Sequence, residues 1–141
     1  KVCALVTGGG YAEYCIADQR AIAILPETIS NGAAVALATQ YCTAYFSALE
    51  MVNLHEGDNV LIHAAAGGVG LLASQWANHL GAIVIGVVSN DKKANLARKH
   101  GCKHIVMADD EKIASKVREL TGGEGVTAVY DSIGKDTFFS S

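Results

Sequence analysis

The chain of 141 residues can bury one sizeable core, and 50% of its residues are hydrophobic, which excludes a disordered protein. Its net charge of -3 and its scattered basic residues exclude the electrostatic footprint of a nucleic-acid-binding protein. The sequence shows neither a signal peptide nor an apolar run of membrane-spanning length, and its cysteines form no CxxC pair. We therefore expect a soluble cytoplasmic protein with reduced thiols.

The first part of the chain carries weak signals. Residues 2–6 and 11–16 flank a glycine turn and predict two short strands. Ser30 is the expected N-cap of a helix from residue 31 to about residue 38, and a second helix is predicted over residues 43–52. Because Lys1 replaces an initiator methionine and the chain stops early in a potential helix, we expect a segment of a longer protein.

Strands and helices then alternate. Strands are predicted over residues 59–65, 83–89, 104–108 and 126–132, and helices over residues 69–80, 91–100 and 111–120. The strands are apolar runs, which is typical of parallel strands covered by helices on both faces. The pattern predicts an α/β fold with a doubly wound parallel sheet, a Rossmann fold, in the order 3-2-1-4. Helical spacing assigns one apolar stripe to the core, and it includes Val69, Leu72, Ala73, Trp76 and Leu80.

A glycine-rich turn links the first of these strands to its helix. Residues 64–70 read Ala-Ala-Ala-Gly-Gly-Val-Gly, which matches the GxGxxG fingerprint except that Ala65 takes the first glycine position. Gly67 would let the backbone approach a pyrophosphate, and Gly70 would let the helix pack closely on the strand. The position between a strand and an amphipathic helix favours dinucleotide binding over a plain tight turn.

The end of the second strand of the unit indicates which nucleotide is bound. An NAD site places Asp or Glu there, about twenty residues beyond the fingerprint, whereas this chain has Ser89. Lys92 and Lys93 supply positive charge nearby, and one of them is expected to be only solvated. Asp91 can cap the following helix or turn towards the ribose, and capping is the expected role. The predicted cofactor is NADPH.

Six blocks, at residues 9–14, 25–26, 43–45, 57–63, 64–70 and 131–134, carry a family resemblance. In this order they resemble the zinc-free quinone oxidoreductases, or ζ-crystallin-like proteins, of the medium-chain dehydrogenase/reductase superfamily. The resemblance implies that residues 1–25 are the carboxyl-terminal remnant of a GroES-like catalytic β domain. It implies that residues 26–141 form a Rossmann dinucleotide-binding domain that is incomplete at its end.

The resemblance also implies residue roles. Thr43 would line the nicotinamide end of the site, Lys93 would meet the 2′-phosphate, and the backbone of the glycine turn would hold the pyrophosphate. A tyrosine that some members place over the 2′-phosphate is Ala108 here. The complete set of predicted cofactor-binding residues is Thr43, Ala66, Gly67, Gly68, Val69, Gly70, Ser89, Asn90, Lys93, Ser132 and Ile133.

No metal site is predicted. Where zinc alcohol dehydrogenases of this superfamily have a cysteine ligand the chain has Thr39, and Cys42 lies three positions away. The five histidines are spread along the chain, and each is interpreted as structural or solvated.

The resemblance implies hydride transfer from NADPH to a quinone, or to the β-carbon of an activated enone, without zinc. The sequence assigns no catalytic residue. Two alternatives stay open: an enoyl-thioester reductase of the same superfamily, or, for this segment alone, a nucleotide-binding module without turnover. The isolated segment is expected to be inactive, because the missing catalytic domain would share the substrate cleft. A small-molecule substrate is expected, with no nucleic-acid or membrane partner. A homodimer is expected. In the segment alone, the strand at residues 126–132 is expected to expose an edge that invites pairing with another chain, whereas the parent protein should associate through its own intact edge.

Overall fold

The computed structural model describes residues 1–109 and 112–141 and shows two compact units, residues 1–42 and 43–141. Each unit has its own elements and is described separately. The predicted boundary after residue 25 concerns the domains of the family, and it stays a prediction. No helix among the described residues combines the length and the apolar character that a membrane crossing requires.

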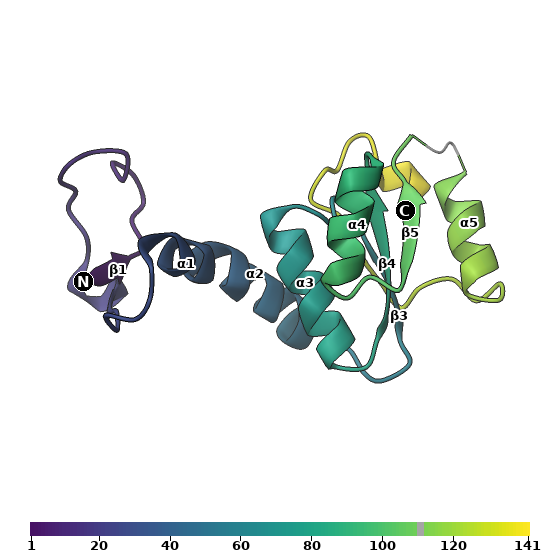
Figure 1. Ribbon diagram of the computed structural model, residues 1–141, viewed down its shortest axis with the longest axis horizontal. Coiled ribbons are helices and arrows are strands. Elements are labelled where there is room, and N and C mark those ends of the chain that lie inside the picture. Colours follow the sequence, from purple (N-terminus) through teal and green to yellow (C-terminus); the bar gives the residue numbers. More distant parts are fainter. Residues whose placement is uncertain (110–111) are drawn as a thin grey trace. The chain divides into compact units, whose positions relative to one another are not determined.

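The first unit contains a small antiparallel sheet (Figure 1). Strand β1 (Val2–Ala4) pairs with β2 (Ile22–Ile24), and the 3-10 helix η1 (Gln19–Ala21) precedes β2. The strand predicted at residues 11–16 is wrong, because this segment is a loop in which Tyr11, Tyr14 and Ile16 are exposed. Its alternating pattern has no sheet face to pack on, so the partner of β1 comes from a later segment.

A helical stretch follows in which α-helical and π-helical turns succeed one another. Helix α1 (Asn31–Ala36) begins at the predicted N-cap, where Ser30 Oγ accepts a hydrogen bond from the Ala33 N–H at 3.2 Å. It is followed by η2 (Leu37–Tyr41), α2 (Cys42–Tyr45) and η3 (Phe46–Met51). The gap predicted between two helices is therefore absent from these described residues. No glycine or proline lies in the gap to end the helix, and π turns absorb the irregularity instead.

The second unit is built on a four-stranded parallel sheet (Figure 1). Its order is β5 (His104–Met107), β4 (Ile83–Val88), β3 (Asn59–Ile62) and β6 (Ala128–Tyr130), which confirms the predicted order 3-2-1-4. The helices between the strands are α3 (Gly68–His79), α4 (Asp91–Lys99) and α5 (Ile113–Leu120). The start of α5 predicted at Glu111 lies outside the described residues. A short 3-10 helix, η4 (Phe138–Ser140), ends the chain.

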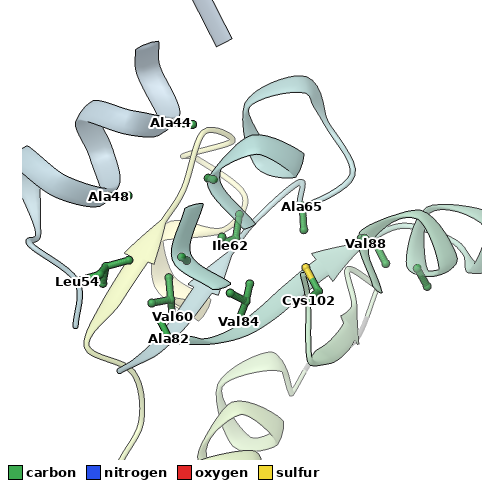
Figure 2. Packing of buried hydrophobic residues seen from close by; sticks show 14 residues of the cluster. Ala44, Ala48, Leu54, Val60, Ile62, Ala65, Ala82, Val84, Val88 and Cys102 are labelled. Carbon is green, nitrogen blue, oxygen red and sulfur yellow. The ribbon is translucent and has the colours of Figure 1, made fainter. Parts of the chain in front are cut away.

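Helices cover both faces of this sheet, as the predicted fold class requires. On one face, alternate strand residues such as Val60, Ile62 and Val84 pack with alanines of α3 and α4 (Figure 2). On the other face, Leu61 and Ile85 belong to a cluster that includes residues of α5. The predicted stripe of α3 lies against the first cluster, where Ala73 is buried and Val69, Leu72, Trp76 and Leu80 are partly buried.

Candidate functional site

The turn between β3 and α3 exposes the start of a helix at the carboxyl edge of the sheet. The Gly67 N–H donates to the Ala64 carbonyl at 2.8 Å, and Ala64 has the unusual φ of 49° that this tight turn requires. Gly67 is the N-cap of α3 and makes no side-chain cap, and both Gly67 and Gly68 are exposed. The first N–H groups of α3 can therefore reach an anion such as a pyrophosphate.

Gly70 allows α3 to pack directly against the end of β3. A Cβ at this position would overlap the carbonyl oxygen of Ala64 and would lie 2.9 Å from the Cα of Ala65. Both atoms belong to the backbone, so they cannot rotate away. This is the packing role that the fingerprint assigns to its last glycine.

Ala65, which departs from the fingerprint, packs into the core (Figure 2). Its relative exposure is 0%, and its backbone does not adopt the positive φ that would favour glycine. The neighbouring strand β4 carries Gly86, where an added Cβ would lie 2.9 Å from the Cβ of Ala65 and 2.7 Å from Cys102 Sγ. Gly86 thus leaves the space that the Ala65 methyl group fills, which explains why glycine is not needed at Ala65.

A cavity of about 260 Å³, here called the fingerprint cavity, opens beside this turn. Lys93 Nζ donates a hydrogen bond to Ser89 Oγ at 2.9 Å, so the two residues predicted to recognise the 2′-phosphate are adjacent. Of the predicted residues, the cavity gathers Ala66, Gly67, Ser89, Lys93 and Ile133. Ala108, at the position of the family tyrosine, also lines it.

The cap of α4 differs from the prediction. Asn90 has an extended backbone and its Oδ1 accepts the Lys93 N–H at 3.0 Å, so Asn90 is the N-cap and Asp91 is the first helical residue. The expected capping role of Asp91 is wrong because the preceding side chain already binds that N–H group. Asp91 is exposed on the first turn, where its negative charge favours the helix dipole.

A second hollow lies along α4 and shares Ala66 and Lys93 with the fingerprint cavity. We call it the lysine groove; its volume is about 550 Å³, and the predicted residue Asn90 lines it. Lys92 and Lys99 also line it, and Lys92 is exposed, so its expected solvated role stays a prediction. Sequence reasoning missed Lys99 and Asn95, although their helical spacing from Lys92 places all three on one side of α4.

A third hollow, the threonine cavity, has a volume of about 370 Å³ and lies between η3, α3 and β6. The predicted residues Thr43, Val69, Gly70 and Ser132 line it, whereas Gly68 lines none of the three hollows and stays at the start of α3. Tyr130 also lines the threonine cavity; its hydroxyl donates to the Ser47 carbonyl at 3.0 Å, and burial raises the pKa of Tyr130. This contact between distant segments had no signal in the sequence.

Asp131 shapes a loop whose residues line the fingerprint cavity and the threonine cavity. Its carboxylate accepts the N–H groups of Ile133 and Gly134 at 2.9 and 3.0 Å and the hydroxyl of Thr137 at 2.6 Å. Burial acts to raise the pKa of Asp131, but these hydrogen bonds and nearby His63 outweigh it and hold the pKa below its usual value. Ile133 and Thr137 line the fingerprint cavity, so the Asp131 turn forms part of its wall.

His63 lines both the fingerprint cavity and the threonine cavity. Its relative exposure is 2%, and its Nε2 lies 2.9 Å from Ser141 Oγ. Burial lowers the pKa of His63, and the negative charge of Asp131 partly opposes this. The sequence interpretation of a structural or solvated histidine did not foresee a position between two cavities.

The described residues contain no group of three or more His, Cys, Asp or Glu side chains that could hold a metal ion. Cys3, Cys15, Cys42 and Cys102 are all free thiols. Cys102 is buried, its Sγ lies 3.3 Å from Ser74 Oγ, and burial raises its pKa. The predicted independence of zinc stays a prediction.

The site has the features of a nucleotide-binding cleft, and an NADPH molecule fits the residues present. The uncapped start of α3, where Gly67 and Gly68 are exposed, suits a pyrophosphate. Lys93 and Ser89 offer a cation and a hydroxyl at the end of β4. Taken together, these groups follow the carboxyl ends of neighbouring parallel strands, which is where ligands bind in open α/β sheets.

Comparisons with known proteins agree with this geometry. The chain is 52% identical over 99 residues to a 2-haloacrylate reductase from Burkholderia, covering 70% of this chain and 30% of that enzyme. It is 41% identical over 133 residues to a quinone oxidoreductase from Pseudomonas aeruginosa, covering 94% of this chain and 41% of that enzyme. A reducing polyketide synthase from Floropilus chiversii is 36% identical over 94% of this chain and 6% of its own length.

Among solved structures, a mycobacterial protein in complex with NADPH superposes with a TM-score of 0.93 and 40% identity, covering 99% of this chain and 43% of that one. The chain thus spans less than half the length of these relatives. The predicted resemblance to quinone oxidoreductases is confirmed. The profile of the family described as "Zinc-binding dehydrogenase" matches residues 68–141, and the chain therefore belongs to this family.

Proposed function

We propose that the chain is the dinucleotide-binding part of an NADPH-dependent oxidoreductase that transfers a hydride to a quinone or an activated enone without zinc. The observation that carries the proposal is the Lys93–Ser89 pair, 2.9 Å apart, in the same cavity as the uncapped start of α3. One end of this cavity suits a pyrophosphate and the other suits a ribose 2′-phosphate. Relatives named quinone oxidoreductase and a neighbour solved with NADPH support it.

Charge in the site favours NADPH over NADH. The residues that line the fingerprint cavity and the lysine groove include Lys92, Lys93 and Lys99 and no Asp or Glu within the described part of the chain. A carboxylate would repel a 2′-phosphate, whereas lysine binds it through charge-assisted hydrogen bonds. Ser89 at the end of β4 adds a neutral hydroxyl that tolerates the phosphate.

The nicotinamide would lie towards the threonine cavity, where Thr43 and Ser132 provide polar groups at its rim. When bound, NADPH supplies the hydride. The residues of the chain orient the cofactor and limit access of water, because β3 and β6 end in buried or partly buried side chains there. Lys93, Ser89 and the fingerprint turn fix the adenosine end, so the position of the hydride donor depends on the whole cleft.

The acceptor is proposed to be a small molecule with an electron-poor double bond. The relative named 2-haloacrylate reductase supports an activated alkene, and the relative named quinone oxidoreductase supports a quinone. A second candidate, enoyl-thioester reduction, is favoured by the match to one segment of a reducing polyketide synthase.

Two further proposals concern the setting of the protein. A homodimer is proposed on the family resemblance alone. A cytoplasmic location is supported by the four free cysteines.

The test combines binding and turnover. NADPH and NADH are titrated into the protein, and NADPH oxidation is then followed with a small quinone, a 2-haloacrylate and an enoyl thioester. Saturable binding that prefers NADPH, with oxidation dependent on quinone, supports the proposal. Binding without turnover is expected of this segment alone, so turnover is compared with a version extended at both ends. Binding without turnover in the extended version supports the nucleotide-binding module instead, and absence of binding refutes both.

A further inference from the structure

His63 lies where the fingerprint cavity and the threonine cavity meet. It follows β3 directly, and its backbone N–H donates to the Tyr130 carbonyl at 2.9 Å, which fixes the ring at the carboxyl edge of the sheet. Among the described residues, it is the one that lines both the fingerprint cavity and the threonine cavity. A dinucleotide that occupies both cavities must therefore pass this side chain.

The hydrogen bonds around Ser141 assign the tautomer of the ring. Ser141 Oγ donates its single proton to the Thr137 carbonyl at 2.7 Å. It can then only accept in its contact with His63 Nε2 at 2.9 Å, so Nε2 carries the ring proton. The other ring nitrogen, Nδ1, is left as a bare acceptor.

Nδ1 of His63 has no partner in the structure although it is buried. A buried acceptor without a donor is unfavourable, and such a group in a binding cleft points to a ligand that supplies the missing donor. The oxygens of a pyrophosphate are acceptors and would repel the Nδ1 lone pair. A ribose hydroxyl is a donor and fits.

We propose that Nδ1 of His63 accepts a hydrogen bond from a hydroxyl of the nicotinamide-side ribose of the bound dinucleotide. This inference rests on the proposed function. The 2′-phosphate and adenosine ribose are assigned to the Lys93–Ser89 end of the fingerprint cavity, and the pyrophosphate to the start of α3. The next group along the molecule is the second ribose, and it enters the threonine cavity beside His63.

The experiment compares two variants that keep opposite halves of the ring. His63→Asn places an amide oxygen, an acceptor, near the position of Nδ1, whereas His63→Gln places an amide N–H, a donor, near Nε2. Each protein is titrated with NADPH, with an NADPH analogue lacking both hydroxyls of the nicotinamide ribose, and with 2′,5′-ADP, which lacks that ribose altogether. Binding is followed by NMR, which tolerates weak affinity, and folding is checked by circular dichroism.

We expect His63→Gln to lower the binding affinity for NADPH by roughly 3- to 10-fold, the range of one neutral hydrogen bond, and to leave the affinities for the deoxy analogue and 2′,5′-ADP unchanged. His63→Asn should retain most of the affinity. Equal losses for all three ligands would show a purely structural role and overturn the inference while leaving NADPH binding intact.

A second measurement needs no variant. In wild-type protein with ¹⁵N-labelled histidine, NADPH should shift the Nδ1 resonance of His63 and the deoxy analogue should not. An Nδ1 chemical shift that does not change when NADPH is added overturns the inference, even if both variants fail to fold. If wild-type protein binds no NADPH at all, the proposed function falls first and this inference with it.

Discussion

Restoring the missing fingerprint glycine should destabilise this protein. Ala65→Gly removes a methyl group with 0% exposure from the core around Gly86 and Cys102. Losing the buried methyl group costs about 0.8 kcal/mol, and glycine loses more backbone freedom on folding, which adds about 0.5 to 1 kcal/mol. We therefore expect the free energy of unfolding to fall by about 1.5 kcal/mol.

The neighbouring Ala64→Gly substitution is a matched control with the opposite expectation. Ala64 is exposed and has a φ of 49°, a conformation that glycine adopts without strain. The relief of strain offsets the lost freedom of the unfolded chain, so the free energy of unfolding should stay level or rise. Two adjacent alanines in one turn would then respond differently to the same change.

A double-mutant cycle tests the contact itself. Gly86→Ala introduces a Cβ 2.9 Å from Ala65 Cβ and 2.7 Å from Cys102 Sγ, and such overpacking costs about 1 to 3 kcal/mol. Combining it with Ala65→Gly removes one of the two close contacts. The double variant should therefore be less destabilised than the sum of the single variants by about 1 kcal/mol.

The assay is urea unfolding followed by fluorescence of the single tryptophan, Trp76, which lies in α3. Unchanged dependence on urea concentration across the variants would show that the same transition is compared. The reasoning is refuted if Ala65→Gly is as stable as wild type or if the cycle is additive. Either result would show that the Ala65 methyl group does not occupy the space that Gly86 leaves open.

Other predictions address the cofactor, metal and pH dependence. Lys93→Ala should lower the binding affinity for NADPH by roughly 10- to 150-fold in a titration and the affinity for NADH far less, because one charge-assisted contact is lost. The control is Lys103→Ala, at an exposed lysine, and equal losses of affinity for both cofactors would contradict the assignment. Elemental analysis of protein purified without a metal-affinity tag should give far less than one zinc per chain, and stoichiometric zinc that survives dialysis would restore the zinc alcohol dehydrogenase interpretation. Burial lowers the pKa of His63 from its ordinary value of 6.5. Just below pH 6.5 the unfolded chain therefore binds a proton at this residue and the folded protein does not, so the free energy of unfolding falls as the pH falls. His63→Gln should flatten this decline between about pH 7 and about pH 5 in urea unfolding while exposed His79→Gln keeps it, and identical slopes in all three proteins would show that His63 does not cause it.

The sheet and its order could be predicted because each element carries a strong local signal. Apolar runs such as Val60, Leu61 and Ile62 become strands covered on both sides, and this is what the two core clusters show. Asn59 and Ile83 open strands that pair in parallel register, as alternation with helices requires. The Gly70 prediction succeeded for the same reason, because its role depends on the backbone next to it.

The failures have physical causes of another kind. The alternation at Tyr11, Tyr14 and Ile16 looks like a strand, but strand formation also requires a partner that local patterns do not specify. Asp91 lost the cap to Asn90 because two good capping residues were adjacent and only backbone geometry decides between them.

The contacts that define the candidate site join residues far apart in sequence. Tyr130 binds the carbonyl of Ser47, and Lys99 reaches the same groove as Lys93 through the helix surface. His63 acquires its position only when β3 lies beside β6. Such juxtapositions depend on the completed sheet, so composition and spacing could locate the cleft but not its polar lining.

The polar lining of the threonine cavity bears on the choice of acceptor. The Tyr130 hydroxyl donates to the Ser47 carbonyl, the Ser47 hydroxyl donates to the Thr43 carbonyl at 2.8 Å, and the hydrogen bonds to Asp131 favour its charged form. Hydride addition to an enoyl thioester leaves a carbanion-like enolate whose carbon needs a proton from a placed acid. Hydride addition to a quinone leaves an oxygen anion, which water protonates readily. Because the protons of the Tyr130 and Ser47 hydroxyls are engaged and Asp131 is held in its charged form, we expect the acceptor assay to favour a quinone over an enoyl thioester.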